Sequence, residues 1–145
     1  MKEIVLSGCF VVNPEKEVYL LFRKKYQHYE TPGGKAEPGE KLRETALREL
    51  FEEVSGIRKD DIIEVKYFGS VHFTIPEGRK AVAHKFIIKL KQSLNLKPAE
   101  YIFDEKLSKF IPIRKLKDIQ EKLSPDLKTL LSDDHQIRNL EYFCR

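Results

Sequence analysis

Interspersed strand-like and helix-like segments predict an α/β or α+β fold with a mixed β-sheet. Two observations support this expectation. Apolar, β-branched runs bounded by turn residues occur in both halves of the chain, and some are spaced as antiparallel hairpins. Between them lies a segment whose apolar residues recur at helical spacing. A chain of 145 residues is expected to form one domain, here residues 1–145.

The first two strands are expected to form a hairpin near the N-terminus. Residues 4–12 are apolar and β-branched, which is typical of a buried strand, and residues 18–22 continue the pattern. The Asn-Pro pair between them predicts a turn. A basic cluster at 23–25 ends the second strand, and Gly33-Gly34 predicts a turn before the first helix.

The rest of the chain is expected to contain further strands and then helices. The turn residues at 76–78 predict a hairpin over 70–90, and Ser124-Pro125 is a favourable helix start, with serine as the cap and proline in the first turn. In chain order, the expected elements are strands at 62–68, 70–75 and 81–90, a loop at 91–105, a short strand at 110–113, the beginning of a helix at 113–123, and one or two helices over 126–143.

One helix is expected from about Leu42 to Ser55-Gly56. Its apolar residues recur at i, i+3, i+4 and i+7, which predicts a face packed on the core. Gly56 is a natural C-terminal stop because glycine adopts the left-handed conformation readily. The apolar stripe comprises Leu47, Leu50, Phe51 and Val54.

Three glutamates crowd the last turns of this helix, roughly opposite the apolar stripe. Glu49, Glu52 and Glu53 are spaced i, i+3 and i+4, so they share a face. The helix dipole disfavours each acid there by about 0.3–1 kcal/mol, and a bound cation would relieve the repulsion. Carboxylates suit Mg²⁺ or Mn²⁺, and the lack of clustered His and Cys argues against zinc. A solvated glutamate-rich face remains the alternative.

The segment around this helix resembles the Nudix box, whose pattern is G-x5-E-x7-R-E-U-x-E-E-x-G-U with U aliphatic. Two residues instead of one separate the last glutamate from Gly56, which is expected to alter the helix exit and not the carboxylate geometry. Residues 110–119 also resemble a late strand-then-helix segment of the family, which extends the resemblance to about Leu123. The matching box positions are Gly34, Glu40, Arg48, Glu49, Leu50, Glu52 and Glu53.

The resemblance implies an α/β/α sandwich with a mixed sheet, and a pyrophosphohydrolase that depends on Mg²⁺ (or Mn²⁺). It also implies roles for the box residues. Glu40 would be an outer metal ligand or an orienting residue, and Arg48 would hold Glu49 by charge-assisted hydrogen bonds. The implied metal ligands are the carboxylates of Glu49, Glu52 and Glu53 and the backbone carbonyl of Gly33.

The general base is expected inside the box, with Glu52 or Glu53 as the first candidate. The loop before the last strand supplies the outside candidates, each of which is more often a solvated loop acid. Those candidates are Glu100, Asp104 and Glu105.

Three residues outside the acidic helix are candidates for substrate contacts. Arg23 ends a strand near the Gly-Gly pair, and Lys35 adjoins that pair, so either could contact a phosphate. Tyr29 could contact a base. A solvated lysine and a core aromatic are the alternatives.

Charge is unevenly distributed along the chain. The net charge is +4, yet residues 37–53 carry −3 and the remainder +7. An acidic metal patch in a basic protein suits a polyanionic substrate bridged by metal, such as a nucleoside diphosphate derivative or a (d)NTP. A triphosphorylated or capped RNA 5′ end is the enzymatic alternative, and scattered solubilising lysines explain the basic excess equally well. A non-catalytic nucleotide-binding module and a plain nucleic-acid-binding domain are the other classes considered.

Composition predicts a cytoplasmic protein without a membrane segment. No apolar run approaches the roughly 20 residues of a membrane span, and no signal-peptide pattern opens the chain. Cys9 and Cys144 lie at opposite ends and form no metal-ligand spacing. A homodimer is possible, but nothing in the sequence indicates it.

Overall fold

The computed structural model describes residues 3–144, so the ends of the expected 1–145 domain lie outside the described residues. The helices are α1 Leu42–Glu53, α2 Pro125–Leu130 and α3 Asp134–Tyr142, with 3₁₀ segments η1 Lys59–Asp61 and η2 Ile113–Lys122. The strands are β1 Ile4–Val12, β2 Glu17–Arg23, β3 His28–Glu30, β4 Gly33–Lys35, β5 Val54–Ser55, β6 Ile62–Thr74, β7 Lys80–Leu90, β8 Lys97–Pro98 and β9 Lys109–Pro112.

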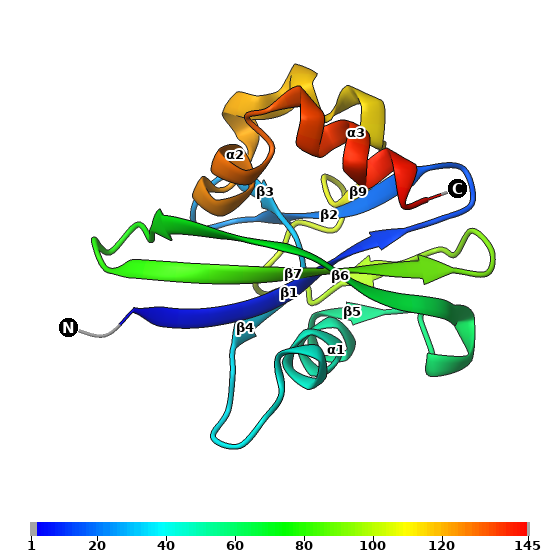
Figure 1. The fold of residues 1–145 in the computed structure, drawn as a ribbon. Coiled ribbons are helices and arrows are strands. Elements are labelled where there is room, and N and C mark those ends of the chain that lie inside the picture. The colour runs from blue at the N-terminus through cyan, green and yellow to red at the C-terminus, as the bar shows by residue number, and fades with distance from the viewer. Residues whose placement is uncertain (1–2, 145) are drawn as a thin grey trace.

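A mixed sheet lies between α1 on one side and η2, α2 and α3 on the other, so the expected α/β/α sandwich is confirmed (Figure 1). The strand order is β3-β2-β1-β7-β6, with β4 paired to β1 and β9 paired to β2. β1 and β7 run parallel, whereas β6 and β7 form a long antiparallel hairpin. Because β1 is covered on both faces, its sequence is almost continuously apolar.

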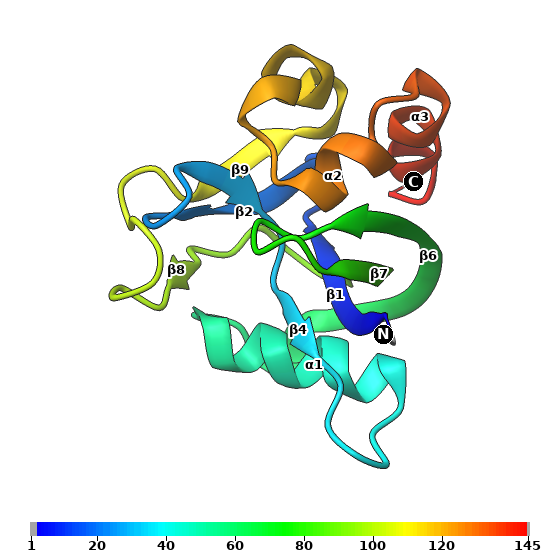
Figure 2. The same ribbon diagram turned by 90° about the vertical axis from the view of Figure 1, so that its left-hand side faces the viewer.

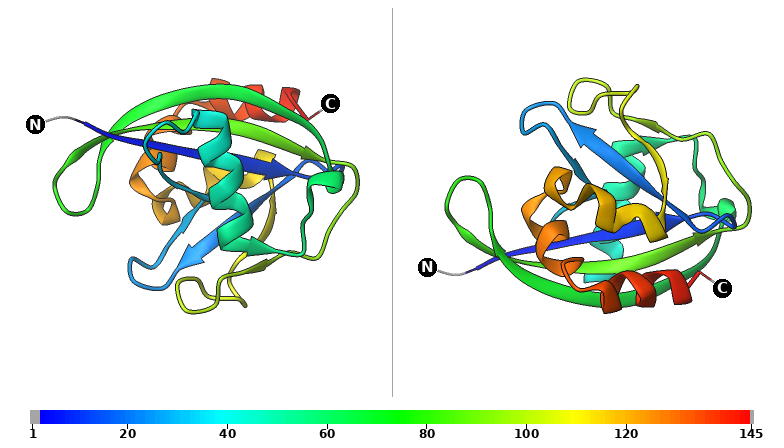
Figure 3. Two further views of the ribbon diagram at one scale, coloured as in Figure 1. Left: turned by 90° about the horizontal axis from the view of Figure 1, so that it is seen from below. Right: turned by 90° about the horizontal axis from the view of Figure 1, so that it is seen from above.

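Two hydrophobic cores fill the space on either side of the sheet, because successive strand residues point to opposite faces. Phe10 and Ile87 pack toward η2, α2 and α3, together with Leu127 of α2. Cys9 and Ile88, their immediate neighbours, pack toward Leu50 and the rest of the apolar face of α1. Figure 3 shows α1 lying across β1 from below, and the C-terminal helices covering the opposite face from above.

The Gly33-Gly34 pair is not the turn that its composition predicts. It forms β4, which pairs antiparallel with β1 so that Gly8 lies opposite Gly33 and Ser7 opposite Gly34. A Cβ on Gly33 would lie 2.9 Å from the Gly8 Cα and 3.0 Å from the Ser7 carbonyl oxygen. The two strands can therefore approach this closely only because glycine has no side chain.

Helix α1 ends at Glu53, earlier than the predicted stop at Ser55-Gly56. Val54 is already extended, with φ −132° and ψ 131°, and its strand β5 pairs with β8. Gly56 adopts a left-handed φ of 89° in the chain reversal that follows. Pairing with a distant segment thus ends the helix before the local glycine signal does.

Two further segments differ from expectation. The strands predicted at 62–68 and 70–75 form one strand, β6, with register shifts near Glu64 and Gly69. The predicted loop 91–105 contains the short strand β8. Within the described residues, no helix has both the length and the apolar character needed to cross a membrane.

Candidate active site

Helix α1 is fixed to the sheet through Ala46 and Leu50, both of which are fully buried. Its N-terminus is held by Glu44, whose carboxylate accepts a hydrogen bond from the Lys41 backbone N–H at 2.9 Å. Leu50 and Val54 of the predicted apolar stripe are buried, whereas Leu47 and Phe51 are half-buried. Glu49 and Glu53 lie against β4, and Glu52 is exposed.

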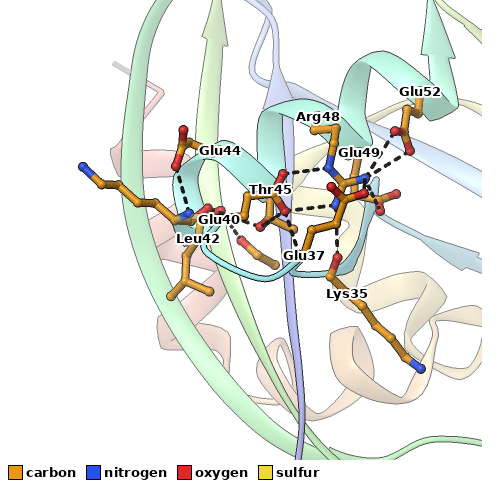
Figure 4. A network of polar contacts seen from close by, with 11 residues as sticks. Lys35, Glu37, Glu40, Leu42, Glu44, Thr45, Arg48, Glu49 and Glu52 are labelled. Atoms are coloured by element: carbon orange, nitrogen blue, oxygen red, sulfur yellow. Dashed lines mark hydrogen bonds and ion pairs between the residues drawn. The ribbon is translucent and has the colours of Figure 1, made fainter.

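Arg48 lies at the centre of the acidic group (Figure 4). Its Nε donates to Glu40 Oε2 at 2.7 Å, and its Nη1 donates to Glu49 Oε1 at 3.1 Å and to Glu52 Oε1 at 3.2 Å. Its Nη2 also donates to the backbone carbonyl of Lys35 at 3.1 Å. The hydrogen bonds to Glu40 and then to the other acids raise the Arg48 pKa, so this guanidinium remains charged. One side chain thus ties α1 to β4 and to the loop between them.

Glu40 is fully engaged by protein donors. Its Oε1 accepts from Thr45 Oγ1 at 2.6 Å and from the Glu37 backbone N–H at 3.0 Å, while Arg48 binds both oxygens. The Arg48 hydrogen bond is the largest cause that lowers the pKa of Glu40 to about 2. These contacts fit the orienting role that the sequence allowed for Glu40 better than that of a metal ligand.

Glu53 lies in a different environment from its neighbours on the helix. Its Oε1 accepts a hydrogen bond from the Gly33 backbone N–H at 2.8 Å. Burial raises the pKa of Glu53 to about 8, and the charge of Glu49 adds to the increase. Burial likewise raises the pKa of Glu49, against the opposing effect of its hydrogen bond to Arg48. Two desolvated carboxylates therefore lie close together beside β4.

The bare backbone of β4 allows these acids to approach it. A Cβ on Gly34 would lie 2.5 Å from the Cδ of Glu49, so any larger residue would force that carboxylate to move. The first glycine of the box, Gly34, is therefore explained by the close contact of its backbone with Glu49, a candidate metal ligand.

A cleft of about 290 Å³ adjoins β4. Its lining includes Gly33, Gly34 and Arg23, while Glu53 lies immediately behind it through its bond to Gly33. Arg23 forms a two-pronged ion pair with Glu30, with Nε–Oε1 at 2.9 Å and Nη2–Oε1 at 2.6 Å. Cationic and acidic groups therefore meet along the wall of one cleft.

The donor chemistry of these acids suits a hard divalent cation such as Mg²⁺ or Mn²⁺. Glu53 accepts its hydrogen bond from the neutral Gly33 backbone N–H, whereas Glu49 is already paired with Arg48. Among the described residues, no three His, Cys, Asp or Glu side chains are already grouped to hold a metal ion. Glu49 and Glu52 bond to Arg48, and Glu53 bonds to Gly33, so these carboxylates would have to turn to share an ion. The carboxylate chemistry thus fits a divalent cation, although the described side chains are not grouped around one in their present positions.

The three residues predicted to contact the substrate lie in different environments. Arg23 lines the cleft, but the side chain of Lys35 extends away from the acidic group, and only its carbonyl joins the network (Figure 4). Tyr29 is 7% exposed and packs edge-on against Phe22, so its position is in the core and not on the cleft wall. Its neighbours Tyr26 and His28 line the cleft instead.

The loop acids predicted as outside candidates for the general base make contacts of their own. Asp104 accepts from the Leu107 backbone N–H at 3.0 Å, and Glu105 lies 3.9 Å from Lys97. None of these acids is among the residues that line the cleft, and the same is true of the exposed Glu100.

Sequence patterns missed four charged residues of the cleft, of which one, Glu77, lies in the predicted turn at 76–78. Glu30 lies outside the box, and Lys85 and Asp126 come from β7 and α2. Isolated charges in a strand or at a helix start carry no motif. Lys85, which interrupts the apolar run of residues 81–90, was the sequence feature that could have indicated a buried charge.

The match to a known family covers most of the chain. The family model described as the NUDIX domain matches residues 4–132. The chain belongs to the NUDIX domain family. A relative from Bacillus subtilis (strain 168), named "Putative 8-oxo-dGTP diphosphatase", is 40% identical over 49 residues, which are 32% of this chain. The chain spans about a third (33%) of the length of the curated relative that it matches.

Solved Nudix-like structures share the whole fold. An Ap4A hydrolase from C. elegans superimposes with a TM-score of 0.69 at 18% identity, covering 99% of this chain and 100% of the other. A MutT protein from Methanosarcina mazei Go1 gives a TM-score of 0.70 at 20% identity, with coverage of 99% and 97%. These likenesses establish the α/β Nudix fold.

A third structure carries a ligand and a metal. It is a bifunctional NMN adenylyltransferase/ADP ribose pyrophosphatase from Francisella tularensis, complexed with AMP and a manganese ion. Its TM-score is 0.68 at 21% identity, with coverage of 99% of this chain and 42% of that chain.

Proposed function

We propose that this Nudix protein hydrolyses the pyrophosphate bond of a nucleoside diphosphate derivative or a (d)NTP, with Mg²⁺ or Mn²⁺ held by Glu49, Glu52 and Glu53. The observation that carries the proposal is the position of these acids. They occupy positions i, i+3 and i+4 of α1, and Glu53 is bonded to Gly33, which lines the cleft. The names of the relatives point to the same substrate class, since they include Ap4A, ADP-ribose and 8-oxo-dGTP enzymes.

The chain's own residues would prepare the site for this reaction. A bound divalent cation would neutralise phosphate charge and lower the pKa of water. Arg48 orients Glu49 while Glu40 holds Arg48 in place, so the network sets the direction of the carboxylates. The carbonyl of Gly33 is the proposed backbone ligand.

The proton acceptor in this proposal is a carboxylate of α1. Glu52 is 57% exposed and can reach a water molecule, whereas Glu53 is more buried beneath β4. Arg23 is the proposed phosphate contact on the cleft wall because its guanidinium lines the cleft. Lys35 stays a second candidate that would have to swing toward the substrate.

One alternative substrate has an observation in its favour. The +7 excess outside residues 37–53 would attract a triphosphorylated RNA 5′ end. A protein of this fold that binds nucleotides without hydrolysing them is the other alternative. Measured turnover would exclude it directly. A single domain and a cytoplasmic location complete the proposal.

The test measures phosphate and pyrophosphate release across (d)NTPs, oxidised dNTPs, ADP-ribose, dinucleoside polyphosphates and triphosphorylated RNA, with and without Mg²⁺. Glu52→Gln is expected to reduce turnover by roughly a hundredfold or more. Glu64→Gln is the matched control, since Glu64 is exposed on β6, away from the acidic group. Metal-independent release, or equal rates in the two variants, would contradict the proposal.

A further inference from the structure

A buried ion pair forms part of the cleft and has no role in the chemistry proposed for the box. Lys85 Nζ of β7 lies 2.8 Å from Asp126 Oδ2 at the start of α2. The two side chains are 6% and 14% exposed, yet both line the cleft that also contains Gly33 and Gly34. Figure 2 shows α2 on the opposite side of the sheet from α1.

The pair retains hydrogen-bonding capacity after its partners are counted. Lys85 has three N–H donors, of which one goes to Asp126 and one to Thr31 Oγ1 at 2.8 Å. Asp126 Oδ1 accepts from Ser124 Oγ at 2.6 Å, and the Leu127 backbone N–H also binds this carboxylate. Among the described residues, two acceptors are thus identified for the three N–H groups of Lys85, and Lys85 is the one side chain found on Asp126 Oδ2.

Stability alone does not account for this pair. Desolvating two charges costs several kcal/mol per ion, and well-packed apolar residues of similar volume commonly stabilise a fold as well or better. A buried charged pair whose spare donor and acceptor adjoin a cleft is instead the arrangement expected for recognising a ligand.

Apolar side chains form much of this part of the cleft, beside the polar Thr31 and Ser124. Leu6, Phe73, Ile75, Ala83 and Pro125 line it. Apolar walls with a few fixed polar groups suit a planar heteroaromatic ring, whose faces contact the walls and whose edge needs hydrogen-bonding partners.

We propose that Lys85 and Asp126 together select a nucleobase with a lactam edge, that is, a ring N–H next to a C=O. The N–H would donate to Asp126 Oδ2, and the C=O would accept from Lys85 Nζ. Charged partners strengthen such bonds, and an exocyclic carbonyl with a lactam N–H matches a cation and an anion better than the ring nitrogen and amine of adenine or cytosine. The inference rests on the proposed function only in taking the ligand to be a nucleotide.

Equilibrium binding of nucleoside monophosphates tests this without requiring turnover. Isothermal titration would compare GMP with AMP, and UMP with CMP. The lactam member of a pair is expected to bind about tenfold more tightly or better, since a hydrogen bond to a charged group is worth that ratio. A preference confined to GMP indicates a purine ligand, and one shared with UMP indicates any lactam base. Equal binding, tighter AMP and CMP, or no binding at millimolar concentration would each overturn the proposal.

1-Methyl-GMP supplies a second comparison in the unmodified protein, because methylation removes the N–H that Asp126 would accept. Its affinity is expected to fall to that of AMP. If it binds as tightly as GMP, Asp126 does not contact that edge.

The double variant Lys85→Met/Asp126→Leu removes both charges together, so neither is left buried and unpaired. It is expected to stay folded by circular dichroism and to lose the base preference in the same titrations. A preference retained in the folded variant would overturn the inference, and an unfolded variant leaves the decision to the GMP and 1-methyl-GMP comparison. If the wild-type protein shows no turnover but binds bases selectively, only the proposed function is contradicted.

Discussion

At the scale of single residues, adjacent glutamates of α1 differ in environment. Glu52 is largely exposed beside Arg48, whereas Glu53 is half-buried against β4 and its pKa is raised to about 8. Sequence spacing predicted the shared face of these acids, because helical geometry is local. It could not predict the difference in burial, which depends on β4 lying across the end of the helix.

The two glycines of β4 are predicted to fail in different ways when replaced. Gly34→Ala meets only the flexible end of Glu49, so stability should change by less than about 1 kcal/mol, whereas turnover should fall about tenfold as the carboxylate moves. Gly33→Ala meets the backbone of β1 and should cost about 1–3 kcal/mol. Urea denaturation and turnover assays of both variants measure this separation. If both variants lost the same stability, the close contacts with β1 would not be the reason for glycine at position 33.

Arg48→Lys is predicted to impair the site although charge is preserved. Lysine cannot reproduce the fork that binds Glu40, Glu49 and Glu52 together, so divalent metal affinity and kcat should each fall about 10–100-fold. Manganese titration followed by steady-state kinetics is the measurement, with Arg43→Lys as the control on the exposed side of the same helix. Wild-type metal affinity in the variant would mean that Arg48 does not orient the acids.

At the scale of elements, α1 joins the site to the sheet. Its apolar stripe was predictable from its 3.6-residue period, but its end was not, since β5 pairs with β8 more than forty residues along. The predicted turn at Gly33-Gly34 is a strand for the same reason. Glycine can adopt many backbone conformations, so composition alone does not fix its structure. Pairing with β1 determines the extended conformation of Gly33 and Gly34.

Leu50→Ala is predicted to loosen α1 from the sheet. Leu50 is fully buried, and truncating such a side chain typically costs 2–5 kcal/mol, that is, about 3 kcal/mol here. Urea denaturation monitored by circular dichroism should show the lower midpoint, while Leu107→Ala, at an exposed position, should change little. A loss below about 1 kcal/mol for Leu50→Ala would contradict the anchoring role.

At the scale of the whole molecule, the cleft is assembled from segments far apart in the chain. The box could be predicted because its residues lie within one loop and one helix. Lys85 and Asp126 could not, since β7 and α2 come together only when the helices cover the sheet. The fold class was predictable from alternating strand and helix periodicity, and the arrangement of the cleft required the tertiary structure.

The Lys85–Asp126 pair is predicted to give stability a pH dependence at acid pH. Burial raises the Asp126 pKa, but Lys85 and the hydrogen bonds outweigh it and hold that pKa below 3.8. The ionised carboxylate therefore stabilises the fold fully above pH 3.8, and that contribution is lost as pH falls through the lowered pKa. Asp126→Asn should cost about 3 kcal/mol near pH 7, and the difference from wild type should shrink below pH 3.8 in urea titrations. A constant difference across that range would show that the carboxylate charge is not involved.

The most direct test of the central claim is Mn²⁺ binding measured by electron paramagnetic resonance. The wild-type protein and Glu64→Gln should bind the ion alike, and the triple variant Glu49→Gln/Glu52→Gln/Glu53→Gln should bind it at least about tenfold more weakly while remaining folded. Unchanged Mn²⁺ affinity in the triple variant would show that the acidic face of α1 does not hold the metal.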